Sequence, residues 1–277
     1  RVQKSFTDPN NKLGIYTKKN NRALDIDAGK RYKVKYEVSD IAGNVSEVVF
    51  WIRGEPPMTL SHGNKLNADE QVFSYEQGNS FNNKDIELYV PANALYDTVT
   101  FSYSKEVTKT GAFSAVHRIH YDYVPLHSWC KLSIRPDGLE EDLQQKALIV
   151  KLEEDGEYSA CGGEMKDGKI MARVREFGNY CVMVDTLAPL IKPVNIHARK
   201  SLLAQHSIQV KITDELSGIE SYNAYLDGKW ILMEYDEKND LLTYHFDNNL
   251  KDGENIFELV VTDERKNTAT YKTTLLY

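Results

Sequence analysis

The sequence contains few cysteines and no long apolar run. Its three cysteines, Cys130, Cys161 and Cys181, lack the CxxC spacing of zinc and redox sites. Cys130 and Cys181 alternate with apolar neighbours, which predicts small buried side chains, and a bridge between them stays open. No stretch approaches the ~18 apolar residues of a membrane-spanning helix. The first residues include neither an initiator Met nor a signal-peptide core, so we expect a piece of a longer chain, truncated at its N-terminus.

The sequence also lacks a basic stripe. Lys and Arg total 34 against 41 Asp and Glu, which gives a net charge of −7, and the basic residues are scattered among the acidic ones. Proteins that bind nucleic acid concentrate cations on one face to neutralise phosphates. We therefore expect no nucleic-acid partner.

The common catalytic motifs are missing as well. The sequence has no HExxH, no GxSxG and no GxxxxGK[ST]. Its densest histidine segment, HRIHYDYVPLH, carries His117, His120 and His127. We predict a strand over 116–124, on which alternation sends His117 and His120 to opposite sides. The segment is then structural and holds no metal, and we expect no enzyme activity, no cofactor and no metal site in this chain.

Composition and patterning predict β-structure. The 17 Tyr accompany many Val, Ile and Thr, residues that favour strands. Residues 34–46 (VKYEVSDIAGNVS) align without gaps with 257–269 (FELVVTDERKNTA), and each copy reads as a β-hairpin. The repeated Asp and Asn (Asp40 and Asn44, Asp263 and Asn267) could bind calcium. One Asp and one Asn fall short of its six to eight oxygen ligands, so we favour a role in closing the turns.

A different unit lies between the two copies. Strand-like runs are DIELYVP, TVTFSYS, VHRIHYDYV, CKLSIRP, KALIVKL, KIMARV and NYCVMVD, with one helical turn in GLEEDLQQK. We predict an all-β chain of tandem antiparallel β-sandwich, immunoglobulin-like modules. The predicted domains are a partial immunoglobulin-like module over 1–55, a middle sandwich over 56–186 and a C-terminal bacterial immunoglobulin-like domain over 187–277.

Several segments resemble known families. DTLAPLI, ITDELSGI, YLDGKW and DGENIFELVVTD resemble a bacterial immunoglobulin-like module. The ordered set YVPANALYDTVTFSYS, LHSWCKLSIRP, KALIV and VREFGNYCVMVDTLAP resembles the non-catalytic C-terminal region of Gram-negative, envelope-associated, lysostaphin-like zinc peptidases of the M23 type. PANAL is also similar to part of the ZU5 domain, a likeness from which we draw no expectation.

The peptidase resemblance implies an accessory role. In that family HxxxD and HxH hold the zinc, and neither spacing occurs in this sequence, so zinc is expected only in an upstream catalytic domain. The implied partners are peptidoglycan or another envelope glycan and the chain's own catalytic domain. The implied location is exported: periplasm, outer-membrane surface or extracellular.

Clustered aromatics support an alternative function. Tyr222, Tyr225, Trp230 and Tyr235 could form an exposed surface that stacks on sugars. Alternation favours core packing for some of them. A carbohydrate-binding module and a structural, protein-docking spacer therefore remain open beside the accessory role.

Overall fold

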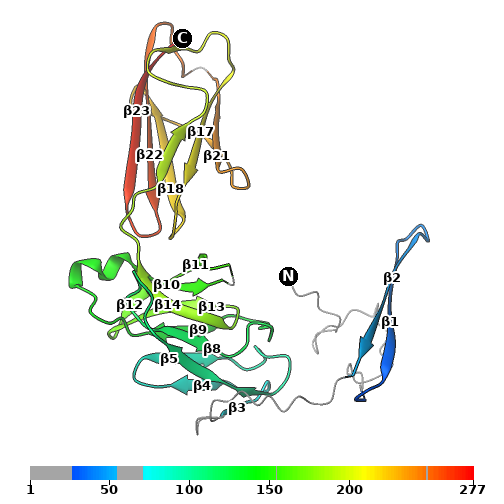
Figure 1. Ribbon diagram of the computed structural model, residues 1–277. Coiled ribbons are helices and arrows are strands. Elements are labelled where there is room, and N and C mark those ends of the chain that lie inside the picture. The colour runs from blue at the N-terminus through cyan, green and yellow to red at the C-terminus, as the bar shows by residue number, and fades with distance from the viewer. Residues whose placement is uncertain (1–26, 55–70, 154, 248) are drawn as a thin grey trace. The chain divides into compact units, whose positions relative to one another are not determined.

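The computed structural model describes residues 27–54, 71–153, 155–247 and 249–277 (Figure 1). These residues form antiparallel sheets and one short 3₁₀ helix, η1 (Glu141–Lys146), so the predicted all-β fold class is confirmed. The chain divides into two compact units, residues 1–69 and 70–277. The predicted boundary between residues 55 and 56 lies outside the described residues, and the three predicted domain ranges stay predictions.

The first unit contains a hairpin. Strands β1 (Arg31–Ser39) and β2 (Val45–Arg53) pair in antiparallel register. The Asp40 carboxylate accepts hydrogen bonds from the Asn44 backbone N–H at 2.8 Å and from Asn44 Nδ2 at 2.7 Å. The predicted role of this Asp and Asn in closing the turn is thus confirmed.

The second unit begins with a sandwich of two five-stranded sheets and a small β3–β6 pair. In spatial order one sheet is β11 (Tyr158–Gly162), β10 (Ala147–Leu152), β14 (Gly178–Val184), β8 (Val116–Ile119) and β7 (Tyr103–Glu106). The other is β12 (Glu164–Lys166), β13 (Lys169–Val174), β9 (Cys130–Ile134), β5 (Ile86–Val90) and β4 (Asn79–Asn82), and the pair is β3 (Gln71–Phe73) with β6 (Val99–Phe101).

The core of this first sandwich follows the alternation of its strands. Ile86, Leu88 and Val90 on β5 are buried, whereas Glu87 and Tyr89 face outward. Each predicted run forms a strand, but patterning missed the short β3, β4, β11 and β12. Burial of alternating apolar side chains from both sheets stabilises the sandwich by roughly 25 cal/mol for each Å² removed from water.

The predicted strand over 116–124 is too long. β8 ends at Ile119 because His120 adopts φ +52°, outside the extended region, and the Val124 N–H then closes a turn onto Tyr121 O at 3.0 Å. Both His117 and His120 are buried, so simple alternation across this segment was wrong.

A second sandwich completes this unit. One sheet is β15 (Leu190–Pro193), β17 (Ser207–Thr213), β21 (Leu241–His245) and β20 (Glu234–Asp236). The other is β16 (Lys200–Ser201), β23 (Thr268–Leu276), β22 (Glu254–Asp263), β18 (Ile219–Leu226) and β19 (Lys229–Ile231), in which only β16 pairs in parallel among the described strands.

The sequence repeat is also a structural one. In the second copy the Asp263 carboxylate accepts hydrogen bonds from the Asn267 backbone N–H at 2.8 Å and from Asn267 Nδ2 at 2.7 Å. These contacts match those of Asp40 and Asn44. The two turns therefore share one hydrogen-bonding scheme.

The three cysteines are free, with Cys130 and Cys181 buried as predicted. Among the described residues, no helix is long and apolar enough to cross a membrane.

Candidate functional site

The histidines of HRIHYDYVPLH bind separate partners. His117 Nδ1 lies 2.8 Å from Tyr103 Oη, and His127 Nδ1 lies 3.0 Å from Tyr96 Oη. His120 packs edge-on against Phe177, with ring centroids 5.1 Å apart. Burial lowers the pKa of His117 to about 4 and also lowers that of His120. These two rings serve as neutral, buried packing groups, as a structural segment requires.

The four aromatic candidates in the second sandwich separate into two pairs. Tyr222 and Tyr235 contact each other with ring centroids 5.6 Å apart, and both pack against the apolar core. Tyr225 and Trp230 are cross-strand partners of β18 and β19, and Trp230 is 53% exposed. Ala224 and Ile231 beside them are buried, which places Tyr225 and Trp230 on the outer face. The four rings thus form no single surface.

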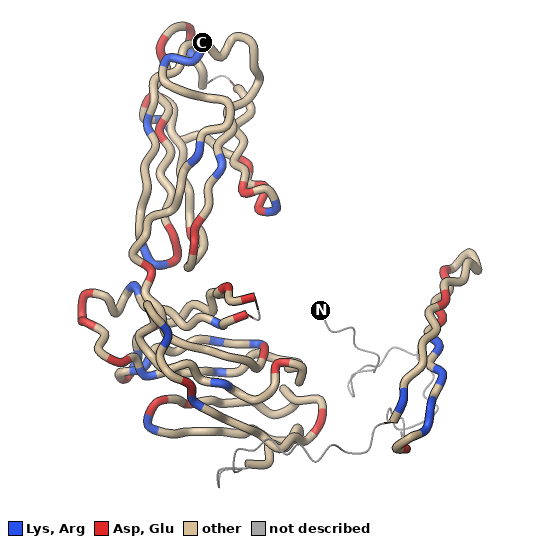
Figure 2. Tube along the Cα trace, in the orientation of Figure 1, with Lys and Arg blue, Asp and Glu red and all other residues tan. Residues whose placement is uncertain are grey.

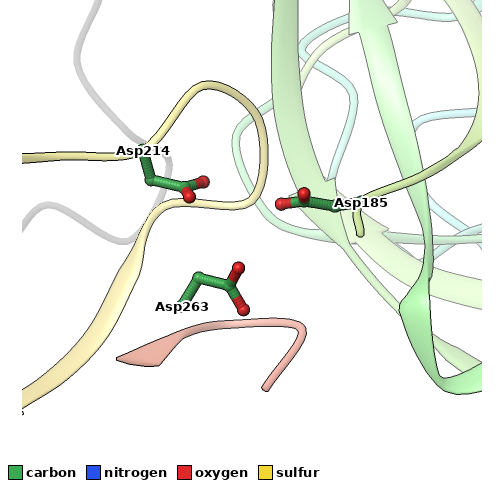
Figure 3. Close-up of side chains that lie close together, drawn as sticks. All are labelled: Asp185, Asp214 and Asp263. Atoms are coloured by element: carbon green, nitrogen blue, oxygen red, sulfur yellow. The ribbon is translucent and has the colours of Figure 1, made fainter. Parts of the chain in front are cut away.

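Three carboxylates meet where the two sandwiches adjoin. Asp185 follows β14, Asp214 follows β17 and Asp263 ends β22. One oxygen of each lies within 4.8 Å of those of the other two, and the side chains point toward one another (Figure 3). Asp185 and Asp263 are buried and Asp214 is partly buried. We call this set the aspartate cluster.

Backbone N–H groups hold each carboxylate in place. Asp185 Oδ2 accepts from Ser217 N at 3.0 Å, and Asp214 Oδ2 accepts from Gly218 N at 2.8 Å. Asp263 Oδ1 accepts from Arg265 N at 2.8 Å, besides its bonds to Asn267. Buried carboxylates require such donors because desolvation otherwise disfavours their charged form.

Two cationic side chains form hydrogen bonds across the same junction. Lys146 Nζ at the end of η1 donates to Arg265 O at 2.7 Å and to Asn267 Oδ1 at 2.6 Å. Arg265 Nη1 donates to Ala147 O at 3.1 Å and to Gly163 O at 2.8 Å, both in the first sandwich. Asn267 Nδ2 also donates to Asp185 O at 3.0 Å. Asn267 therefore closes its own turn and joins the two sandwiches.

Apolar contact accompanies these bonds. Leu216, from the loop after β17, packs against a cluster of the first sandwich that includes Leu148, Val150 and Cys181. The junction thus combines buried apolar area with bonds between charged and backbone groups, which are stronger than neutral pairs.

The chemistry of the aspartate cluster suits hard cations. Carboxylate oxygens are ligands for Ca²⁺, whereas protein zinc sites rely on Cys and His, which this cluster lacks. Two charged carboxylates within 4.8 Å of each other repel by roughly 3 kcal/mol or more at an effective dielectric constant of about 20. The backbone N–H donors offset part of that repulsion, and the cluster belongs to the hydrogen-bonded junction.

Sequence reasoning identified only part of this site. Asp263 and Asn267 were recognised as turn residues, but Asp185 and Asp214 were not associated with them. The sequence held one clue, since both follow apolar alternating runs in segments that resemble one immunoglobulin-like module. Acidic and basic residues are interleaved along the described strands, so charge pattern pointed to no junction (Figure 2).

One known family matches the first sandwich. Residues 70–185 match the family model of the Zu5-like domain. That match covers the first sandwich and ends at Asp185, where the aspartate cluster begins. The short likeness of PANAL to ZU5 is thereby confirmed at the level of a domain.

Solved structures resemble the chain only weakly. The fibronectin(III)-like modules of Clostridium thermocellum CbhA match with 9% identity and a TM-score of 0.27, over 54% of this chain and 85% of that one. The Bacteroides ovatus SGBP-B of a mixed-linkage glucan utilization locus, in complex with a mixed-linkage heptasaccharide, matches with 11% identity and a TM-score of 0.22, over 90% of this chain and 53% of that one. Superpositions this weak identify no ligand for this chain. No curated protein matches its sequence.

Proposed function

We propose that this chain is a non-catalytic accessory region that positions the catalytic domain of an exported, cell-wall-degrading peptidase. The observation that carries the proposal is the junction between the two sandwiches. Lys146, Arg265 and Asn267 bond across it, and Leu216 packs into it. A region whose two sandwiches bond to each other is suited to positioning an attached enzyme.

The linker supports the same role. Only Thr186-Leu187-Ala188-Pro189 separates Asp185 from β15, and Asp185 Oδ1 accepts the Leu187 N–H at 3.1 Å. Proline restricts its own φ and the conformation of the residue before it. Relative motion is the default for domains within one chain, and here a four-residue linker and hydrogen bonds across the junction restrict it.

The peptidase part of the proposal rests on the sequence motifs. The segments from YVPANAL to VMVDTLAP resemble the accessory region of M23-type zinc peptidases, and the HxxxD and HxH spacings that hold zinc there are missing from this sequence. In this proposal zinc belongs to an upstream catalytic domain, and the parent protein is bacterial and located in the cell envelope or secreted.

Metal content and hydrolysis test the proposal directly. We expect the purified chain to carry less than stoichiometric zinc by elemental mass spectrometry and to release no soluble peptides from peptidoglycan. In the parent protein, we expect deletion of residues 70–277 to change the rate of cleavage of whole cell walls more than that of a short soluble peptide. Stoichiometric zinc with cleavage by the isolated chain would contradict the proposal.

A second candidate function is glycan binding by the second sandwich. The adjacent Tyr225 and Trp230 on the outer face of the β18–β19 hairpin favour it, because exposed rings can stack on sugars. Loss of polysaccharide binding in Trp230→Ala would support this candidate.

A further inference from the structure

The Zu5-like sandwich carries an open groove of about 710 Å³, a volume within the ~300–1,000 Å³ of small-molecule sites. It lies over the sheet that contains β5, β9 and β13. The side chains that shape its chemistry are Tyr89, Trp129, Lys131, Glu164, Met171 and Arg173.

Strand register brings these side chains together. Tyr89 on β5 pairs with Lys131 on β9, which pairs in turn with Arg173 on β13. Trp129 directly precedes β9, is exposed and lines the same groove as Lys131. Tyr89, Lys131 and Arg173 come from three neighbouring strands of one sheet, whose pairing sets their spacing before any ligand binds.

Both aromatic rings are accessible. Trp129 is 50% exposed and Tyr89 is 47% exposed. The Tyr89 ring lies so close to Gly78 that a Cβ built there would sit 2.8 Å from Tyr89 Oη. Glycine at this position lets the tyrosine lie across the neighbouring β4 end of the sheet. Single exposed aromatics are common on protein surfaces, whereas two rings in one groove with cations are typical of a ligand site.

The cations of the groove are available to a ligand. Arg173 Cζ stands 5.5 Å from the centre of the Trp129 ring, a cation–π contact that orients the guanidinium. Among the described residues, neither Lys131 nor Arg173 forms an ion pair with a carboxylate. Since the whole chain has a net charge of −7, two such cations beside each other mark a local preference for an anion.

The thiols of the groove offer no competing chemistry. Cys130 and Cys161 also line it, but burial raises the pKa of Cys130 to about 12 and that of Cys161 to about 11. Neutral thiols are poor nucleophiles and poor metal ligands. The groove is therefore suited to binding.

We propose that this groove binds an acidic saccharide, with Trp129 and Tyr89 against the apolar faces of the sugar rings and Arg173 and Lys131 on a sugar carboxylate. Guanidinium groups bind carboxylates with paired, charge-assisted hydrogen bonds. Glu164 at the β12 edge accepts bonds from sugar hydroxyls. The inference holds whether or not the chain belongs to a peptidase.

Calorimetry with matched oligosaccharides tests the proposal. Trigalacturonic acid is the acidic probe, and the same trisaccharide with its carboxyl groups reduced to alcohols is the neutral probe. We expect the acidic probe to bind at least tenfold more tightly than the neutral one at low ionic strength and to lose affinity as salt is added. The intact 277-residue chain is used throughout.

Four variants locate the site. Trp129→Ala should weaken binding of the acidic probe at least tenfold, and Arg173→Gln should remove most of the difference between the two probes. Gly78→Ala should weaken binding by displacing Tyr89. Trp51→Ala, an exposed tryptophan on the β1–β2 hairpin that lies in no site described for this chain, should leave binding unchanged.

Other outcomes would overturn the inference. They are absence of binding by the acidic probe, equal affinity for both probes, or binding lost in Trp230→Ala but kept in Trp129→Ala. Far-ultraviolet circular dichroism of each variant confirms that a loss of binding reflects the groove and not unfolding.

Discussion

At the scale of the residue, buried histidines illustrate how burial converts a reactive side chain into a structural one. His117 is 1% exposed, bonds to Tyr103 Oη and has a pKa lowered to about 4, chiefly by desolvation and further by nearby Lys105. Between pH 6.5 and about 4, His117 is protonated in the unfolded chain but stays neutral in the folded one. Burial of this histidine therefore lowers the free energy of unfolding at acidic pH.

The pH dependence of stability tests this role. The stabilising contribution of neutral His117 is fully present above pH 6.5 and is lost as the pH falls toward about 4. Urea unfolding at pH 7.5 and 4.5 should show a loss of stability that is about 2–3 kcal/mol larger in the native chain than in His117→Gln. His120 and the carboxylates titrate in both proteins and cancel in the comparison. Equal pH dependence in both would contradict the assignment.

At the scale of the element, glycines permit the corner between the two sheets of the Zu5-like sandwich. The chain passes from β11 to β12 through Gly163, whose φ is +129°. A Cβ there would lie 2.8 Å from Ile170 Cγ2 and 3.1 Å from Met171 O. Gly163 O also accepts the bond from Arg265. The same corner thus shapes the sandwich and takes part in the junction.

Two alanine substitutions distinguish the cost of steric overlap from the cost of a left-handed backbone conformation. Gly168, in the β12–β13 turn, has φ +74°, but no atom lies within 4 Å of the position that a Cβ would take. Gly168→Ala should cost about 1–2 kcal/mol from the left-handed conformation alone. Gly163→Ala should cost more than about 3 kcal/mol, since steric overlap is added. Guanidinium unfolding measures both, and equal losses would show that Gly163 is not crowded.

At the scale of the whole molecule, one turn design serves two purposes. Asp40 and Asn44 close an exposed hairpin, whereas Asp263 and Asn267 close the same turn, and Asn267 also bonds to Asp185 and Lys146. The additional contacts arise because the second copy lies at the junction with the first sandwich. The repeat therefore supplies a turn in one place and a docking element in the other.

Matched asparagine variants measure the docking contribution. Asn267→Ala should destabilise residues 70–277 by about 2–3 kcal/mol, since a buried carboxylate and a lysine lose partners. For these residues we expect calorimetry to resolve one transition in the native sequence and two in the variant. Asn44→Ala removes the equivalent side-chain bond to Asp40 in the exposed hairpin and should cost about 1 kcal/mol or less. A single unchanged transition in Asn267→Ala would mean that the sandwiches do not stabilise each other through this residue.

Much of the fold followed from local pattern. Runs such as Ile86–Val90 and Cys130–Ile134 carry apolar residues at every second position, so their strands and buried faces were predictable. The short β3, β4, β11 and β12 were not, because none of them repeats an alternation of buried apolar and exposed residues. His120 ended its strand early through a backbone conformation that side-chain alternation does not encode.

The sequence by itself determined that this chain is built from antiparallel β modules, that its two hairpin turns are alike and that the histidine spacings of the zinc peptidases are missing, because these properties depend on neighbouring residues. Only the tertiary structure decided which distant residues meet. Asp185, Asp214 and Asp263 converge at the junction, Tyr89, Trp129 and Arg173 converge in the groove, and the predicted aromatic foursome separates into two pairs. These contacts depend on how strands pair and how the sandwiches pack, and the spacing of residues within one segment does not determine either.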